Sequence, residues 1–232
     1  MSNINNKVEV QVLDDLHYLK NGKRCKKVWG HGINDADYEV QPRSGNGKQE
    51  MCPIYDRWVG MLRRCYSSKY KIKNETYRNV VCCKEWLLFS NFKSWMEKQK
   101  WQDRQLDKDL LSYKNEVYSP DLCIFVPKEI NTFMIKSDKT RGEYPLGVSF
   151  YKKRGNFIAG GNDSIRKMST TFGYANTPKQ AHKLWQEQKI KSAIFLRNKY
   201  CNTGDLLIAK GLQRVIDKIQ HDLDNNLITE DF

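Results

Sequence analysis

Carboxylate, amide and amine side chains gather in one short stretch, LDKDLLSYKNEVYSPDLCIFVPKEINTF, which runs from Leu106 to Phe133. The polar residues in it that could do chemistry are Asp107, Lys108, Asp109, Asn115 and Asp121. Carboxylates and amides in a loop can hold a divalent cation, and such a cation can activate water and stabilise charge on a scissile phosphate. These residue types therefore allow metal-assisted hydrolysis of a phosphodiester.

The surrounding residues predict the elements that would hold this loop. The Ser119-Pro120-Asp121 corner is typical of a turn. The apolar run from Leu122 to Val126 predicts a short strand, and the segment from Lys128 to Phe133 predicts a helix. The expected order is strand, loop, strand, helix. A plainer interpretation stays open, in which a β-hairpin packs on a helix and its charges are only solvated.

The same stretch resembles the LDRID…GNYSPENCRWVT…EQ signature of phage-encoded HNH endonucleases of the homing-endonuclease type. It is more similar still to a phage subfamily that reads LDKDIL…GNKVYSPExCxFV…IN. The resemblance implies a ββα-metal finger and DNA cleavage or nicking that depends on Mg²⁺ or Mn²⁺. It implies metal ligation by Asp107 and Asp121, with Asn115 orienting groups in the loop.

Lys108 stands where that family has its catalytic His. The family's distal metal-binding Asn falls near Asp121-Leu122, so either Asp121 replaces it or that ligand is lost. A Lys is normally charged at neutral pH and cannot accept a proton unless its pKa is strongly depressed. An active enzyme would use Lys108 to neutralise the phosphate, with Asp109 as the other available base. The alternative is a catalytically degenerate, nuclease-derived protein that binds DNA or a host factor, as an anti-defence protein would.

Two further segments are predicted to be amphipathic helices. Ile54 to Tyr66 has apolar residues at helical spacing after Pro53, which suits a first turn. Glu85 to Gln99 carries an aromatic stripe of the kind that usually packs in a core, and a short strand, Val80 to Cys83, precedes it. Both segments resemble the HNH-family stretches YxxWxxMLxRCY and VCxEWxxFxNFxxWM.

Seven cysteines without a secretory signal argue against a disulfide framework. Five of them are candidate zinc ligands: Cys52, Cys65, Cys82, Cys83 and Cys123. No Cys-x-x-Cys knuckle is present, and zinc sites normally keep strict ligand spacing. We therefore expect no structural zinc, and we expect Cys65 and Cys123 to be buried as small apolar residues.

The C-terminal part predicts a small sheet followed by a helix. Strands are expected over Leu146 to Tyr151, Asn156 to Ala159 and Met168 to Tyr174, with basic turns between them. The helix is expected from Pro178 to about Arg197, with Thr177 as its N-cap.

The pattern GVS…KKRGNFIA…FGYANTPKQAHKLW resembles the Apetala/ERF-type DNA-binding domain, which lays its sheet in the major groove. The resemblance implies nucleic-acid contacts by the basic turn residues, which are Lys152, Lys153, Arg154, Arg166 and Lys167. A simpler interpretation is that these residues form two solvated hairpin turns.

The net charge of +13, on a background of 27 acidic residues, favours a polyanionic partner, and nucleic acid is the commonest one. Ribosomal or membrane-surface binding would give the same charge. No stretch is apolar over the roughly 20 residues of a spanning helix, so no membrane partner is expected. The polar start, MSNINNKVEV, predicts a cytoplasmic protein, in an infected bacterial host if it is phage-encoded.

The sequence thus predicts an α+β protein, with a ββα-metal (HNH-like) finger, flanking helices and a small module of three strands and a helix. The expected parts are an N-terminal extension (1–50) with a strand from Val8 to Leu13, an HNH-like nuclease domain (51–135), an Apetala/ERF-like domain (145–200) and a helical tail (201–232). The tail, helical from Leu206 to Leu223, either caps the structure or makes it dimerise, so the oligomeric state stays open.

Overall fold

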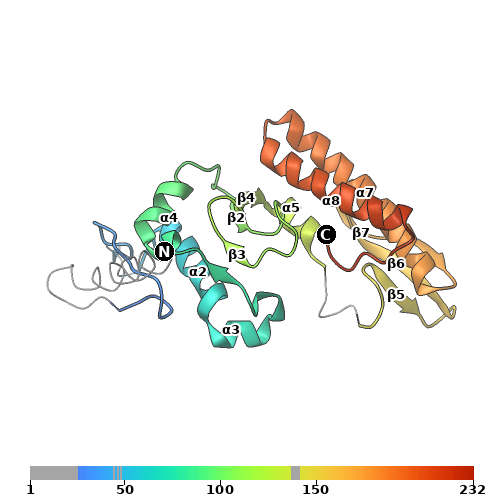
Figure 1. The fold of residues 1–232 in the computed structure, drawn as a ribbon, viewed down its shortest axis with the longest axis horizontal. Helices are drawn as coiled ribbons and strands as arrows, with labels where there is room; N and C mark the ends of the chain where they lie inside the picture. The colour runs from blue at the N-terminus through green and yellow to red at the C-terminus, as the bar shows by residue number, and fades with distance from the viewer. Residues whose placement is uncertain (1–25, 44, 46, 48, 137–141) are drawn as a thin grey trace, which may run out of the picture. The chain divides into compact units, whose positions relative to one another are not determined.

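The computed structural model describes residues 26–43, 45, 47, 49–136 and 142–232. Over this part the protein has mixed α/β structure, with small sheets and helices packed on them (Figure 1). It divides into two compact units. Unit 1 holds the described residues of 26–99 and 116–121, and unit 2 holds those of 100–115 and 122–232. The predicted nuclease domain, 51–135, therefore contributes residues to both units, and the strand predicted at Val8 to Leu13 lies outside the described residues.

Unit 1 is built on α2 (Pro53–Tyr66), which the apolar spacing predicted almost to the residue. Trp58, Met61 and Leu62 on its inner face are fully buried. The remaining elements of the unit are α3 (Ser68–Lys73), η2 (Glu75–Tyr77), β1 (Val81–Cys82), η3 (Glu85–Leu87), α4 (Phe89–Met96) and β3 (Val117–Tyr118). β1 and β3 pair in parallel, and the Trp58 indole donates a hydrogen bond to the Trp86 carbonyl.

The helix predicted from Glu85 to Gln99 is broken at Leu88. Leu88 has an extended backbone because the segment at Ile33 pairs with it there. Asp35 then caps the start of α4 by accepting bonds from the backbone N–H and hydroxyl of Ser90, at 2.8 and 2.5 Å. The aromatic stripe of this region is core, as predicted, since Trp86, Phe89 and Phe92 are buried.

Unit 2 begins with the antiparallel pair β2 (Arg104–Asp107) and β4 (Ile124–Pro127), followed by α5 (Lys128–Met134). The two predicted strands and the helix after them are therefore present in the predicted order, but the segment predicted as a loop between the strands also contains β3, which belongs to unit 1. The unit continues with β5 (Val148–Tyr151), β6 (Asn156–Asp163), β7 (Met168–Ala175), α7 (Pro178–Asn202) and α8 (Leu206–Asp224). Thr177 caps α7 as predicted, because its side chain accepts a bond from the Gln180 backbone.

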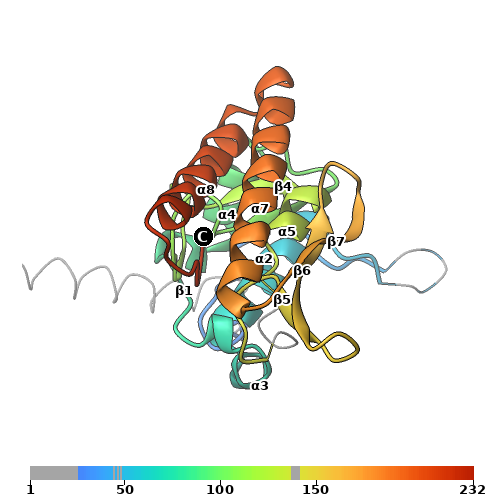
Figure 2. The ribbon, with the colours of Figure 1, turned by 90° about the vertical axis from the view of Figure 1, so that its right-hand side faces the viewer.

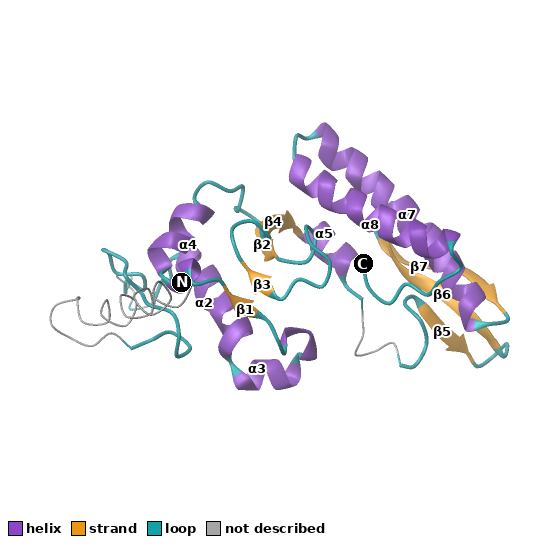
Figure 3. Cartoon of the chain, in the orientation of Figure 1, coloured by secondary structure: helices purple, strands orange, loops and turns teal. Residues whose placement is uncertain are grey.

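β5, β6 and β7 form an antiparallel sheet, and α7 packs across one face of it (Figures 2 and 3). Val148, Ala159 and Gly173 lie side by side in the strand register and face α7. A β-bulge between Ala159 and Gly160 leaves Phe172 as an extra residue on β7, where it also packs toward the core of the unit. The opposite face of the sheet, which we call the outer face, is not covered by α7.

Gly147 lies where the chain enters β5, with φ +71°. A Cβ added to Gly147 would stand 1.8–2.4 Å from atoms of the Trp185 indole of α7, which is closer than any real contact. Only glycine therefore suits both the left-handed backbone and the close packing of this turn.

We expect Gly147→Ala to lower the free energy of unfolding of unit 2 by about 2–4 kcal/mol, because backbone strain and overpacking add. Gly155→Ala is the matched control: φ is +65°, but an added Cβ would meet nothing within 4 Å. Its expected cost is about 1–2 kcal/mol. Urea denaturation measures both, and equal costs would contradict the packing argument.

Lys189 of α7 is a charged residue in the core of unit 2, with 9% of its surface exposed. Its amine donates to the Phe133 carbonyl at the end of α5. Burial lowers the pKa of Lys189 to about 7, and the charge of Lys136 lowers it further. Between pH 7 and the unfolded-state pKa near 10.4, the unfolded chain holds a proton that the folded chain has released.

The free energy of unfolding should therefore rise with pH across this window by up to about 1.4 kcal/mol per pH unit relative to Lys189→Met. The difference is measured by denaturation of both proteins from pH 6 to 10, with exposed Lys191→Met as the control. Parallel stability curves for wild type and Lys189→Met would show that Lys189 keeps its ordinary pKa.

Candidate functional site

The end of β2 places Asp107 at the start of the predicted catalytic loop. Its Oδ1 atom accepts hydrogen bonds from the backbone N–H groups of Asp109 (3.0 Å) and Leu110 (2.8 Å). Asp107 is 8% exposed, and burial raises the pKa of its carboxyl above the ordinary value, although the hydrogen bonds from Leu110 and Asp109 act in the other direction. Asp107 thus holds the turn that begins the loop.

Lys108 and Asn115 close the same loop by bonding to each other's backbone. The Lys108 amine donates to the Asn115 carbonyl at 2.7 Å, and the Asn115 side-chain amide donates to the Lys108 carbonyl at 2.7 Å. The Lys108 amine also contacts Asp109 Oδ1 at 2.5 Å. Both Lys108 and Asn115 are buried. The structure therefore brings the four predicted catalytic residues together, but as partners of one another and of the loop backbone.

Arg214, which the sequence analysis did not single out, supports the loop from α8. Its guanidinium donates to the carbonyls of Leu110 (3.1 Å) and Asp109 (3.0 Å). Gly211, one turn earlier, lets Leu110 approach, because an added Cβ would stand 2.5 Å from Leu110 Cγ. A glycine inside an amphipathic helix was the available signal, since it often marks such a close approach.

Asp121, the second expected metal ligand, belongs to unit 1, where it is exposed in a turn after β3. Within residues 107–115 the carboxylates are those of Asp107 and Asp109. Asp107 uses Oδ1 to hold the turn, and Asp109 is bound to an ammonium group. An ammonium at this distance repels a metal ion, so this donor set does not fit Mg²⁺ or Mn²⁺.

Throughout the described ranges, no three His, Cys, Asp or Glu side chains are grouped so that they could hold a metal ion. Cys65 and Cys123 are buried, as predicted.

The predicted nucleic-acid residues form two groups at opposite ends of the three-stranded sheet. Lys152, Lys153 and Arg154 are exposed in the turn between β5 and β6. Arg166 and Lys167 are exposed in the turn between β6 and β7. The strand β6 separates the two turns, and its seven residue steps at roughly 3.3 Å give a distance of about 23 Å.

Arg154 reaches from its turn onto the outer face of the sheet. Its guanidinium lies 5.1 Å from the centre of the Tyr174 ring and 6.0 Å from that of Tyr151. The two rings lie 6.0 Å apart, and Tyr174 is 47% exposed. Ser149 and Ile158 lie in the same cross-strand row as Tyr174. We call Ser149, Tyr151, Arg154, Ile158 and Tyr174 the outer-face cluster.

The second basic turn is held by Asp163, which is 2% exposed. Asp163 Oδ1 accepts from the backbone N–H groups of Ile165 and Arg166 at 2.9 and 3.2 Å. The Arg166 side chain lies 3.8 Å from the same carboxylate and is itself two-thirds exposed. The turn is therefore fixed in shape while its basic side chains face solvent.

No family model, no curated protein and no solved structure matches this chain. The resemblances to HNH endonucleases and to Apetala/ERF domains therefore rest on the quoted motif residues alone. In the parts of the chain that the structure describes, no helix is long and apolar enough to cross a membrane.

The Asp107 carboxylate gives a direct test of a structural role. Asp107→Ala should lower the free energy of unfolding of unit 2 by about 1–3 kcal/mol, because two buried N–H groups lose their acceptor. Asp107→Asn keeps an acceptor oxygen and removes a charge that burial disfavours, so it should cost less than Asp107→Ala or stabilise the unit. Added Mg²⁺ should leave the unfolding midpoint of the wild type unchanged. Equal losses in both variants, or a midpoint that rises with Mg²⁺, would contradict this role.

Proposed function

We propose that this chain binds DNA through the outer face of the β5–β7 sheet and the basic turns at its two ends. We also propose that residues 107–115 act as a structural loop and not as a metal-dependent catalytic centre. The observation that carries the proposal is the Arg154 guanidinium lying over the half-buried ring of Tyr151 and the exposed ring of Tyr174. The Apetala/ERF resemblance of the same residues supports it.

The dimensions of the outer face suit a duplex groove. Three strands at a spacing of roughly 4.8 Å place the outer strands about 10 Å apart, and the major groove of B-DNA is about 12 Å wide. Tyrosine rings and an arginine fork supply stacking surface and hydrogen-bond donors for base edges. Basic turns on both ends would contact phosphates, which fix position on the duplex without reading sequence.

The separation of the two basic turns favours an extended polyanion over a small ligand. No small anion spans about 23 Å, whereas a nucleic-acid backbone continues past both ends of the sheet. The net charge of +13 adds long-range attraction to such a partner. Each lysine or arginine that neutralises a phosphate should contribute to the salt dependence of binding.

We expect the double variant Arg154→Ala/Tyr174→Ala to weaken duplex-DNA affinity by roughly tenfold or more, since it removes the exposed stacking and donor groups. Lys152→Ala/Lys153→Ala should weaken binding to all sequences alike and reduce the slope of log K against log salt by about 0.9 per lysine. Fluorescence anisotropy with labelled duplexes measures both.

The matched control is Lys183→Ala/Lys191→Ala, which removes the same charge from exposed positions on α7. This control should lose less affinity than Lys152→Ala/Lys153→Ala. Equal losses from the two charge pairs would mean that only net charge matters and would contradict a role for the sheet.

Metal-dependent DNA cleavage is the second candidate, and it is favoured by one observation: Asp107, Lys108, Asp109 and Asn115 converge in a single loop, as the HNH resemblance requires. A plasmid-nicking assay with Mg²⁺ or Mn²⁺ separates the candidates. The proposal expects no nicking above the level of Asp107→Ala. Nicking by the wild type that is lost in Asp107→Asn, a variant that keeps the turn, would establish cleavage instead. Absence of both nicking and salt-sensitive DNA binding would favour a host protein as the partner.

A further inference from the structure

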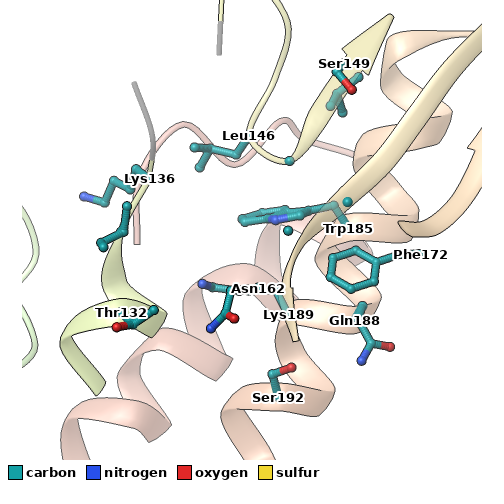
Figure 4. Close-up of a pocket in the computed structure, with 15 residues that line it drawn as sticks. Thr132, Lys136, Leu146, Ser149, Asn162, Phe172, Trp185, Gln188, Lys189 and Ser192 are labelled. Atoms are coloured by element: carbon teal, nitrogen blue, oxygen red, sulfur yellow. The ribbon is translucent and has the colours of Figure 1, made fainter. Parts of the chain in front are cut away.

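Unit 2 contains a cavity of about 320 Å³, and of the outer-face cluster only Ser149 lines it. It lies between the end of α5, the chain entering β5, the bulged part of β6, and α7 (Figure 4). Its walls are mixed in character. Trp185, Phe172 and Leu146 present apolar surface, while Asn162, Gln188 and Ser192 bring polar side chains to it.

Lys189 is the buried cation of this cavity. Its amine lies 3.8 Å from the centre of the Phe133 ring, 4.7 Å from that of Phe232 and 5.9 Å from that of Trp185. Its hydrogen bond goes to the Phe133 carbonyl. These rings and this carbonyl carry only partial negative charge, so they stabilise the ammonium without neutralising it.

Within the described residues, Lys189 makes no ion pair. The other amine that lines the cavity, Lys136, pairs with Asp231 and so does not need a further anion. Lys136 also repels the Lys189 ammonium, whose pKa it lowers. A buried charge without a counter-charge is costly, and in known structures such charges are paired or bind ligands. The cavity beside Lys189 offers the space for a missing counter-ion.

The size and walls of the cavity limit what can enter. Ligand pockets usually have volumes of roughly 300–1,000 Å³, so this one suits a molecule with a single ring. The bulge in β6–β7 turns the Phe172 ring toward the cavity, where the Trp185 indole gives a second flat wall. The side chains of Asn162 and Ser192 can donate hydrogen bonds to an oxyanion.

We propose that this cavity binds a small organic anion, with its carboxylate or phosphate group beside the Lys189 ammonium and its flat apolar body against Trp185. The ligand supplies the negative charge that the described residues do not, and it keeps Lys189 protonated. Binding therefore takes up a proton wherever free Lys189 is neutral. The cavity shares Ser149 with the outer-face cluster, and its other lining residues lie outside that cluster. Ligand binding and DNA binding can therefore be measured separately.

Isothermal titration calorimetry with benzoate, phenyl phosphate and neutral benzamide tests the proposal. Comparing benzoate with phenyl phosphate shows whether the cavity prefers a carboxylate or a phosphate group. At least one anion should bind more tightly than benzamide. Its affinity should fall by up to tenfold per pH unit above pH 7, because the bound state holds one more proton. At pH 8 the measured heat should depend on the ionisation enthalpy of the buffer, as proton uptake requires.

Lys189→Met should abolish binding of that anion, while Lys191→Met on the exposed side of the same helix should leave it unchanged. Lys189→Met replaces a buried charge with an apolar chain of similar length, so the variant should fold, and its unfolding midpoint at pH 7 verifies this. Failure of both anions to bind at millimolar concentration, or equal binding by Lys189→Met, would overturn the proposal.

Discussion

Apolar burial along α7 is the interaction on which unit 2 depends. The helix packs against all three strands of the sheet on one side and against α8 on another. Its residues Trp185, Ala193 and Leu196 belong to one continuous core with residues of α5, the sheet and α8. The core fixes the sheet through its inner face only. The outer face is consequently free to carry exposed aromatic and basic side chains without cost to the packing.

Lys108 and Lys189 are both buried, but their surroundings differ. Lys108 is held by a carboxylate and a carbonyl, so its charge serves to close the 107–115 loop. Lys189 has aromatic rings and a carbonyl around it, and its pKa falls because burial disfavours the ammonium. A buried lysine with a counter-charge, such as Lys108, therefore has a structural role. Lys189 makes no ion pair within the described residues and is a candidate to bind a ligand. Exposed lysines and arginines give the third case, in which charge is available to an external polyanion.

Much of the secondary structure could be predicted from the sequence because its signals are local. Pro53 and the apolar spacing placed α2, Thr177 and Pro178 placed the start of α7, and the basic turns separated the three strands. Pairing between distant segments could not be predicted. The break at Leu88 comes from its contact with Ile33, and β6 extends past Ala159 because β7 pairs with Gly160 to Asp163. This segment begins with two glycines, and glycine is depleted in strands, so its sequence alone does not predict a strand.

The candidate site, too, could be predicted only in part from the sequence. The motif placed four residues in one loop, and they do converge there. The motif alone could not show that the Asp107 carboxylate accepts hydrogen bonds from backbone N–H groups, or that Arg214 of α8 donates to the loop. These contacts depend on the folded arrangement. The role of Lys189 cannot be predicted from the sequence for a similar reason. A lysine is ordinary on a helix surface, and only the packing of α5 and the sheet against α7 makes this position a buried one.

Residue-level mapping of DNA contact by NMR, with an unlabelled duplex added to isotope-labelled protein, shows which surface of the chain meets DNA. If the sheet binds DNA, the largest chemical-shift changes will fall on the outer-face cluster and on the turns at 152–155 and 164–167, and they will diminish as salt is raised. Changes that are confined to residues 107–115, or that leave the sheet untouched while DNA binds, would contradict DNA binding by the sheet.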